Sequence, residues 1–144
     1  MDNSNLLRDL VRALEKNIGA FEKSKMKCCG LNIGQCYVVL EIGLADEISL
    51  IDLAKLLNLD KSTMSRAVNN LVNAGLVDRL IDAGNRRYVK LQLTEQGQSA
   101  FTIINATFDS YLMSILDAIP EDKRDQVMES LKILIVALNK NQCC

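Results

Sequence analysis

Apolar residues recur every three to four positions in several separate segments of the chain, which is the spacing of amphipathic helices. One such segment spans residues 3 to about 25, and a second spans residues 32 to 44. Two short helical patterns then meet at residues 58–60, and two longer ones occupy residues 94 to about 118 and 120 to about 139. The pattern predicts a mainly α-helical chain.

The two short helical patterns carry the expected capping residues. Ser49 can cap the first, with Asp52 three residues on to complete a capping box. Asp60 can cap the second, because its carboxylate can accept hydrogen bonds from the free amides of the first turn, and Gly75 suits its end. The apolar stripe of the first helix is Leu50, Leu53, Ala54, Leu56 and Leu57, and that of the second is Met64, Ala67, Val68, Leu71 and Val72.

A period-two pattern follows the second short helix. Residues 77–80 and 88–93 read as two strands, and in the latter Val89, Leu91 and Leu93 alternate with polar positions. Residues 81–87 form the expected tip. The order helix, turn, helix, hairpin is a winged helix-turn-helix, here over residues 48–94, which places one helix in a DNA major groove and a hairpin beside it.

Short polar side chains and one arginine cover the face of the second short helix opposite its apolar stripe. Arg and Asn can read guanine and adenine edges, and Ser and Thr can bind phosphates or bases. A solvated helix face is the plainer interpretation, but Lys and Glu usually dominate such a face. The candidate DNA contacts are Lys61, Ser62, Thr63, Ser65, Arg66 and Asn69 on the helix and Arg86, Arg87 and Lys90 on the hairpin.

The hairpin residues have separate expected roles. Paired arginines at a wing tip suit a narrow, negative minor groove, so Arg87 is expected to enter it. Arg86 and Lys90 are expected to contact the DNA backbone. The alternative is an ordinary solvated turn.

These motifs resemble the MarR family of bacterial transcriptional regulators. The family wing ends in an Asp-x-Arg pattern, followed by a Leu-Thr-x-x-Gly pattern that opens the next helix. The matching residues here are Asn85-Arg86-Arg87 and Leu93-Thr94-Glu95-Gln96-Gly97, together with the recognition-helix opening Asp60-Lys61-Ser62-Thr63-Met64-Ser65-Arg66. Asn85 departs from the family's Asp, which in the family helps orient the wing arginine.

The terminal segments, residues 3–30 and 95–140, have apolar stripes far in sequence from the expected DNA-reading part. A chain of 144 residues offers little core to cover both, so pairing across a two-fold axis would bury them. The resemblance implies the same homodimer, formed through the terminal helices. Two-fold symmetry also suits a palindromic operator, with half-sites about one helical turn apart. A monomer is the alternative.

Charge is unevenly distributed along what we expect to be a single domain, residues 1–144. The net charge is −1, yet residues 55–90 contain seven Lys or Arg and three Asp. This predicts a basic reading head on a mildly acidic body, able to release DNA. Asp2, Arg8 and Asp9 interrupt any apolar run that could form a signal peptide, and no apolar segment is long enough to span a membrane, so we expect a cytoplasmic protein.

The chain has five cysteines and no histidine, which leaves no His zinc ligand and no His-based catalytic dyad. The candidate sensor residues are Cys28, Cys29, Cys36, Cys143 and Cys144. They could bind a thiophilic metal or metalloid, or they could sense oxidants or electrophiles, because nearby lysines favour the thiolate. A third interpretation is structural, with Cys36 a small core residue and the last two part of a tail.

The sequence therefore predicts a homodimeric, sequence-specific DNA-binding transcriptional regulator. It would be a repressor released by a small ligand, a thiophilic metal or an oxidant, with no cofactor required. The alternative is a winged-helix protein–protein interaction module without DNA binding, which the net negative charge and Asn85 favour. An enzyme is not expected, because no cysteine has a recognisable partner base.

Overall fold

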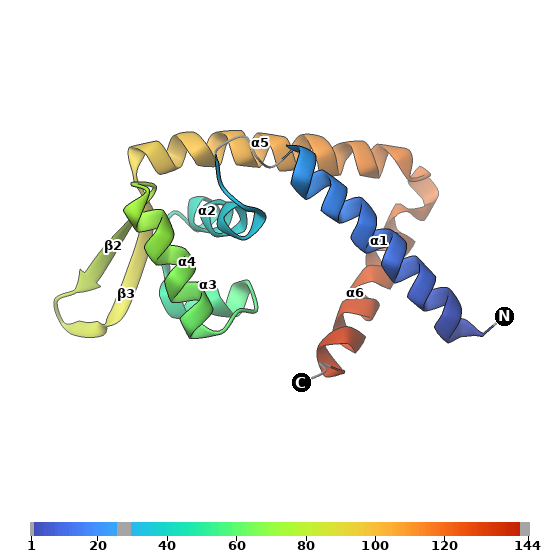
Figure 1. Cartoon of the computed structure of the whole chain (residues 1–144), viewed down its shortest axis with the longest axis horizontal. Helices are drawn as coiled ribbons and strands as arrows, with labels where there is room; N and C mark the ends of the chain where they lie inside the picture. Colours follow the sequence, from blue (N-terminus) through green and yellow to red (C-terminus); the bar gives the residue numbers. More distant parts are fainter. Residues whose placement is uncertain (1, 26–29, 142–144) are drawn as a thin grey trace. The chain divides into compact units, whose positions relative to one another are not determined.

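The computed structural model describes residues 2–25 and 30–141 and is mainly helical, with a small β-sheet (Figure 1). This confirms the predicted winged helix-turn-helix class. The elements are α1 (Asn3–Lys25), α2 (Ile33–Ala45), β1 (Ile48–Ser49), α3 (Leu50–Leu56), α4 (Lys61–Asn73), β2 (Val77–Asp82), β3 (Asn85–Leu93), α5 (Glu95–Ala118), the 3-10 helix η1 (Glu121–Lys123) and α6 (Arg124–Lys140). The chain divides into two compact units, residues 1–107 and 108–144, and each is described by itself.

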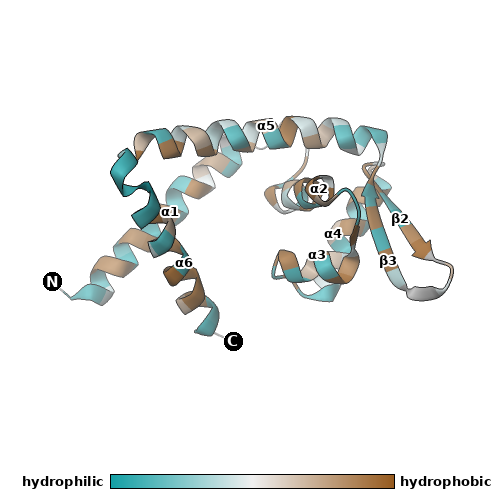
Figure 2. Cartoon of the chain, turned by 180° about the vertical axis from the view of Figure 1, so that it is seen from behind, coloured by the Kyte–Doolittle hydropathy of each residue, from teal (hydrophilic) through white to brown (hydrophobic). Residues whose placement is uncertain are grey.

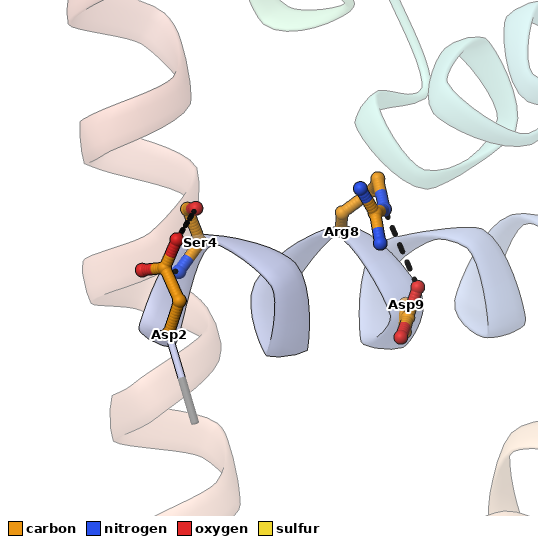
Figure 3. Close-up of polar contacts among 4 residues, drawn as sticks. All are labelled: Asp2, Ser4, Arg8 and Asp9. Atoms are coloured by element: carbon orange, nitrogen blue, oxygen red, sulfur yellow. Dashed lines mark hydrogen bonds and ion pairs between the residues drawn. The ribbon is translucent and has the colours of Figure 1, made fainter.

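Helix α1 begins with local polar contacts that face solvent (Figure 3). The Ser4 amide donates a hydrogen bond to Asp2 Oδ1 at 3.2 Å, and the Ser4 hydroxyl donates one to Asp2 Oδ2 at 2.8 Å. The hydroxyl first, and then the amide, hold the pKa of Asp2 below its ordinary value. Arg8 Nε lies 3.4 Å from Asp9 Oδ1, and both side chains are 60% exposed, so this ion pair contributes little to stability.

The first unit has a continuous apolar core built from α2, α3, α4 and the sheet. Its fully buried side chains are Val38, Val39, Ile42, Leu53, Met64, Val68, Leu71, Val77 and Leu91, together with Cys36 and Ile104. On α4 the buried positions recur at helical spacing, as the sequence predicts. The core therefore fixes which face of α4 remains available to a ligand.

One residue of the predicted α3 stripe is placed differently. Leu53 and Ala54 are buried, but Leu56 is 57% exposed, so its prediction as a core residue was wrong. Successive helical residues are about 100° apart around the axis, so Ala54 and Leu56 lie on opposite sides of Leu53. Ala54 faces the core, and Leu56 therefore points away from it. Because α3 ends at Leu56, no following turn of helix covers that side.

The sheet has three antiparallel strands in the order β1-β3-β2. Strand β1 pairs Ile48 with Leu91, and the hairpin pairs Val77 with Leu93 at its base. The sequence did not predict β1, because two residues are too few to show a period. The hairpin turn is also tighter than predicted: the strands leave only residues 83–84 between them, so Arg86 and Arg87 belong to β3 and not to the tip.

The last helix begins later than predicted. Pro120 has φ −51° and ψ 134°, and it precedes η1 instead of opening α6. The Lys123 amide donates to the Pro120 carbonyl at 2.8 Å, and Arg124 Nε donates to the Ile119 carbonyl at 3.1 Å. These bonds complete a tight turn before α6 starts.

Large apolar side chains remain exposed on the helices at both ends of the chain. Figure 2 shows hydrophobic segments (brown) along both α1 and α6. On α1 they are Leu6, Leu7, Leu10, Leu14 and Ile18, with exposed fractions of 44% to 59%. On α6 they are Met128, Leu131, Ile133, Ile135, Val136 and Leu138, with fractions of 39% to 62%. In the part of the chain that the structure describes, no helix combines the length and the apolar character needed to cross a bilayer.

Candidate nucleic-acid interface

The helix-turn-helix is held by caps at the start of each of its helices. Ser49, only 5% exposed, accepts a hydrogen bond from the Asp52 amide on its Oγ at 3.0 Å, which caps α3 as predicted. Between the helices, Asn58 has φ +53°, a left-handed conformation that Asn adopts more readily than most residues. This reverses the chain over residues 57–60 and delivers Asp60 to the start of α4.

Asp60 caps α4 through Thr63, as predicted. The Thr63 hydroxyl donates a short hydrogen bond to Asp60 Oδ1, and the Thr63 amide donates one to Oδ2 at 3.1 Å. The hydroxyl first, and then the amide, lower the pKa of the Asp60 carboxyl. The Thr63 hydroxyl proton is thus engaged within the helix, which leaves its oxygen only as an acceptor toward a ligand.

The polar face of α4 is open to solvent, opposite the buried Met64, Val68 and Leu71. Most of the predicted contact residues on this helix are exposed, namely Lys61, Ser62, Arg66 and Asn69, whereas Thr63 and Ser65 are half-buried. Asn70 is a further exposed amide that the sequence analysis did not single out. It lies four residues after Arg66, which is the signal that could have found it.

A shallow hollow of about 410 Å³ lies at the turn between the two helices. Its lining combines three apolar residues, Ile51, Ala54 and Leu59, with four polar or charged ones, Lys55, Asn58, Asp60 and Lys61. Lys55 and Lys61 bring positive charge to the end of α4 at which the free amides of its first turn point outward. The Asp60 carboxylate already lies at this end of the helix and accepts the hydrogen bond of the Thr63 amide.

Strand β1 pairs with β3, and Glu47, the residue before β1, lies beside Lys90, one of the predicted DNA contacts. Lys90 Nζ lies 2.9 Å from Glu47 Oε1, and Gln92 Nε2 donates to Glu47 Oε2 at 3.0 Å. Lys90 first, and then Gln92, lower the pKa of Glu47. The two side chains of the ion pair are 44% and 36% exposed, so Lys90 remains accessible at the base of the wing. The sequence missed Glu47 because 43 residues separate it from Lys90 along the chain.

The cysteines are only partly placed. Cys28, Cys29, Cys143 and Cys144 lie outside the described residues. Cys36 is fully buried in α2, where it occupies a core position. Burial first, and then Glu22 and Cys36, raise the pKa of the adjacent Tyr37. Within residues 2–25 and 30–141, no group of three or more acidic or cysteine side chains is placed to hold a metal ion.

Comparison with known proteins supports the resemblance to this family. Residues 30–87 match the family model described as "MarR family". The HTH-type transcriptional regulator BilQ of Clostridium symbiosum is 26% identical over 114 residues, which is 79% of both chains.

Two solved structures have the same fold. Streptococcus pneumoniae FabT in complex with DNA superposes with a TM-score of 0.81 at 20% identity, covering 98% of this chain and 100% of FabT. The S. aureus MepR–DNA complex superposes with a TM-score of 0.80 at 20% identity, covering 96% of this chain and 99% of MepR. The family match over residues 30–87 and the shared fold confirm the predicted resemblance to the MarR family of winged helix-turn-helix transcriptional regulators.

Proposed function

We propose that this protein is a homodimeric transcriptional regulator that binds a palindromic DNA operator. The observation that carries the proposal is the two-sided character of α4. One face, with Met64, Val68 and Leu71, is fixed in the core, and the other presents exposed Arg66 and Asn69. The relatives that share the fold include FabT and MepR, whose structures were solved with DNA.

In this proposal α4 enters the major groove and the hairpin lies beside it. Arg66 and Asn69 read base edges, while Lys61 and Ser62 at the start of the helix contact phosphates. Arg87 enters the minor groove, and Arg86 and Lys90 contact the backbone. The local excess of positive charge between Lys55 and Lys90 supports this assignment.

The homodimer is proposed from the exposed apolar side chains of the terminal helices. Leu10 is 59% exposed on α1, and Leu138 is 55% exposed on α6. Exposed apolar side chains gathered along one helix, as on each of these two, mark an interface. A two-fold partner would cover it and would set two α4 helices toward successive turns of DNA.

Release from DNA is proposed to follow a small ligand, a thiophilic metal or an oxidant that acts near Cys28, Cys29 and Cys36. A hollow of about 550 Å³ is lined by residues that precede and follow Cys28 and Cys29 in the sequence, namely Glu22, Lys23, Gly30, Leu31, Asn32 and Ile33. Titrating the DNA complex with arsenite, copper(I) or peroxide tests the proposal. We expect release by one of them in the wild type and none in a Cys28→Ser/Cys29→Ser variant. Equal responses of the two proteins would return the cysteines to a packing role.

The test of DNA binding uses duplexes selected from a random pool by the wild-type protein. Arg66→Ala should weaken binding to the selected duplex by about 1–3 kcal/mol, because a base-reading contact is lost. It should weaken binding to random duplex by less. Arg12→Ala, which removes an exposed arginine on α1, is the control and should change neither affinity. Absence of any salt-dependent DNA binding would instead favour a protein–protein interaction module.

A further inference from the structure

The end of the proposed recognition helix α4 is fastened directly to the start of α5. Helix α4 closes with two bonds of a Schellman motif, from the Gly75 amide to the Val72 carbonyl and from the Leu76 amide to the Leu71 carbonyl, both at 3.0 Å. Gly75 has φ +79°, which only glycine adopts without strain. The carbonyls of Gly75 and Leu76 are thereby turned away from α4 and need other partners.

Thr94 supplies both partners. Its hydroxyl donates to the Gly75 carbonyl at 2.6 Å, and its amide donates to the Leu76 carbonyl at 3.0 Å. The same hydroxyl oxygen accepts a hydrogen bond from the Gly97 amide at 3.0 Å, which caps α5. One threonine therefore joins the last residues of α4 to the first turn of α5, and the contact is part-buried.

Two close approaches fix the direction of α5 on leaving this joint. A Cβ on Gly97 would lie 2.0 Å from the Leu76 carbonyl oxygen, so the helix backbone packs against the chain at that point. One turn later, a Cβ on Gly43 would lie 2.2 Å from the Phe101 ring, so the ring rests directly on α2. The first turns of α5 are thus attached at two separate points to the reading head, by which we mean the segment from α2 to β3, residues 33–93.

We propose that Thr94 is a specificity-determining residue: through the joint of α4 with α5, it sets the separation of half-sites that the dimer accepts. This inference rests on the proposed function. In a dimer, the two heads strengthen each other's binding only when both reach their half-sites at the same time. A stiff joint between α4 and α5 therefore favours one distance between the half-sites. A loosened joint leaves each head intact but weakens that selection.

The experiment measures the binding of full-length wild type, Thr94→Val, Thr94→Ser and Thr102→Val. The duplexes are a palindrome selected by the wild type, the same palindrome with one or two base pairs added or removed between the half-sites, and a single half-site. Thr102→Val is the matched control, because the Thr102 hydroxyl donates to the Gln98 carbonyl, at 3.1 Å, within α5 itself.

We expect Thr94→Val to bind the selected palindrome about fivefold more weakly, to bind the single half-site as wild type does, and to discriminate less between spacings. Thr94→Ser, which keeps the hydroxyl, and Thr102→Val should behave as wild type. Amide hydrogen exchange at Gly97 should be faster in Thr94→Val alone, because its acceptor is lost. If Thr94→Val does not fold, Phe101→Leu loosens the second attachment point and should show the same loss of spacing selectivity.

Equal weakening of palindrome and single half-site, with spacing selectivity retained, would overturn the inference and leave Thr94 a support of the head alone. That outcome leaves the proposed DNA binding standing. A wild type that binds no selected duplex would overturn both proposals together.

Discussion

The segment from α2 to β3 and the helices at the two ends of the chain both carry regular apolar stripes, but they differ in what covers those stripes. In the head, Leu53 and Met64 are fully buried. On α6, in contrast, no residue is buried. A stripe in the sequence therefore predicts that a helix has an apolar face, but not whether the same chain covers it.

The largest effect is expected in the head. Leu53→Ala should lower the free energy of unfolding by about 2–5 kcal/mol, since it leaves a cavity in a packed core. The matched control is Leu56→Ala on the same helix, where Leu56 is 57% exposed and the loss should stay within about 0.5 kcal/mol. Urea denaturation followed by circular dichroism measures both. Similar losses in the two variants would contradict the burial pattern of α3.

A second substitution tests the terminal helices. Leu10→Asp places a charge on the exposed apolar face of α1 and should weaken dimerisation by about a hundredfold, because a charge cannot be buried unpaired at an interface. Lys16→Asp introduces the same carboxylate at an exposed polar position of α1 and should leave the dimer intact. Analytical ultracentrifugation gives the masses. A Leu10→Asp variant that remains dimeric would show that this face is not the interface.

A smaller effect is expected from pH at the start of α4. The pKa of Asp60 in the folded protein is below the ordinary value of 3.8, so its cap stabilises the fold above that pH and is lost as pH falls through the lowered pKa. Below about pH 4, wild-type stability should therefore fall more steeply than that of Asp60→Asn. Parallel thermal melts from pH 6 to 2.5 measure the difference. If the two stability profiles superimpose, the Asp60 carboxylate does not contribute to the loss of stability at low pH.

The smallest effect is expected at the base of the wing. Glu47→Gln removes the carboxylate that lies 2.9 Å from Lys90 Nζ. Without this carboxylate beside it, the Lys90 ammonium should neutralise a phosphate more completely, so non-specific DNA affinity should rise and the slope of log K against log salt should steepen by up to about one. Glu129→Gln on α6 removes a charge elsewhere and is the control. An unchanged slope in Glu47→Gln would show that Lys90 does not approach DNA.

The sequence predicted the elements well where the pattern was long or carried a cap. Ser49 and Asp60 act as the predicted caps, and α1 spans the predicted residues. Two of the errors concern strand pairing, which the periodic pattern of neither segment reveals. Strand β1 forms only because Ile48 meets Leu91, and the hairpin turn is shorter because pairing continues to residues 82 and 85.

The candidate site was predictable in its residue types but not in its pairings. The exposed positions of α4 follow from helical periodicity, so Arg66 and Asn69 could be selected from the sequence. The pairing of Glu47 with Lys90 could not be selected in this way, since it depends on the pairing of β1 with β3. The double role of Thr94 was equally hidden, because a capping motif reveals the bond to Gly97 but not the bond to Gly75.

The hairpin register is regular from its base to the pair Ile81–Val89 and then shifts, so that Asp82 pairs with Asn85. The base is fixed by the pairing of Val77 with Leu93, and side chains alternate between the two faces along the regular part. Removing one residue from each strand would send every position beyond the change to the opposite face. The regular part of the hairpin can therefore be lengthened or shortened without exchanging its two faces only in steps of two residues per strand, each of which changes its length by about 7 Å.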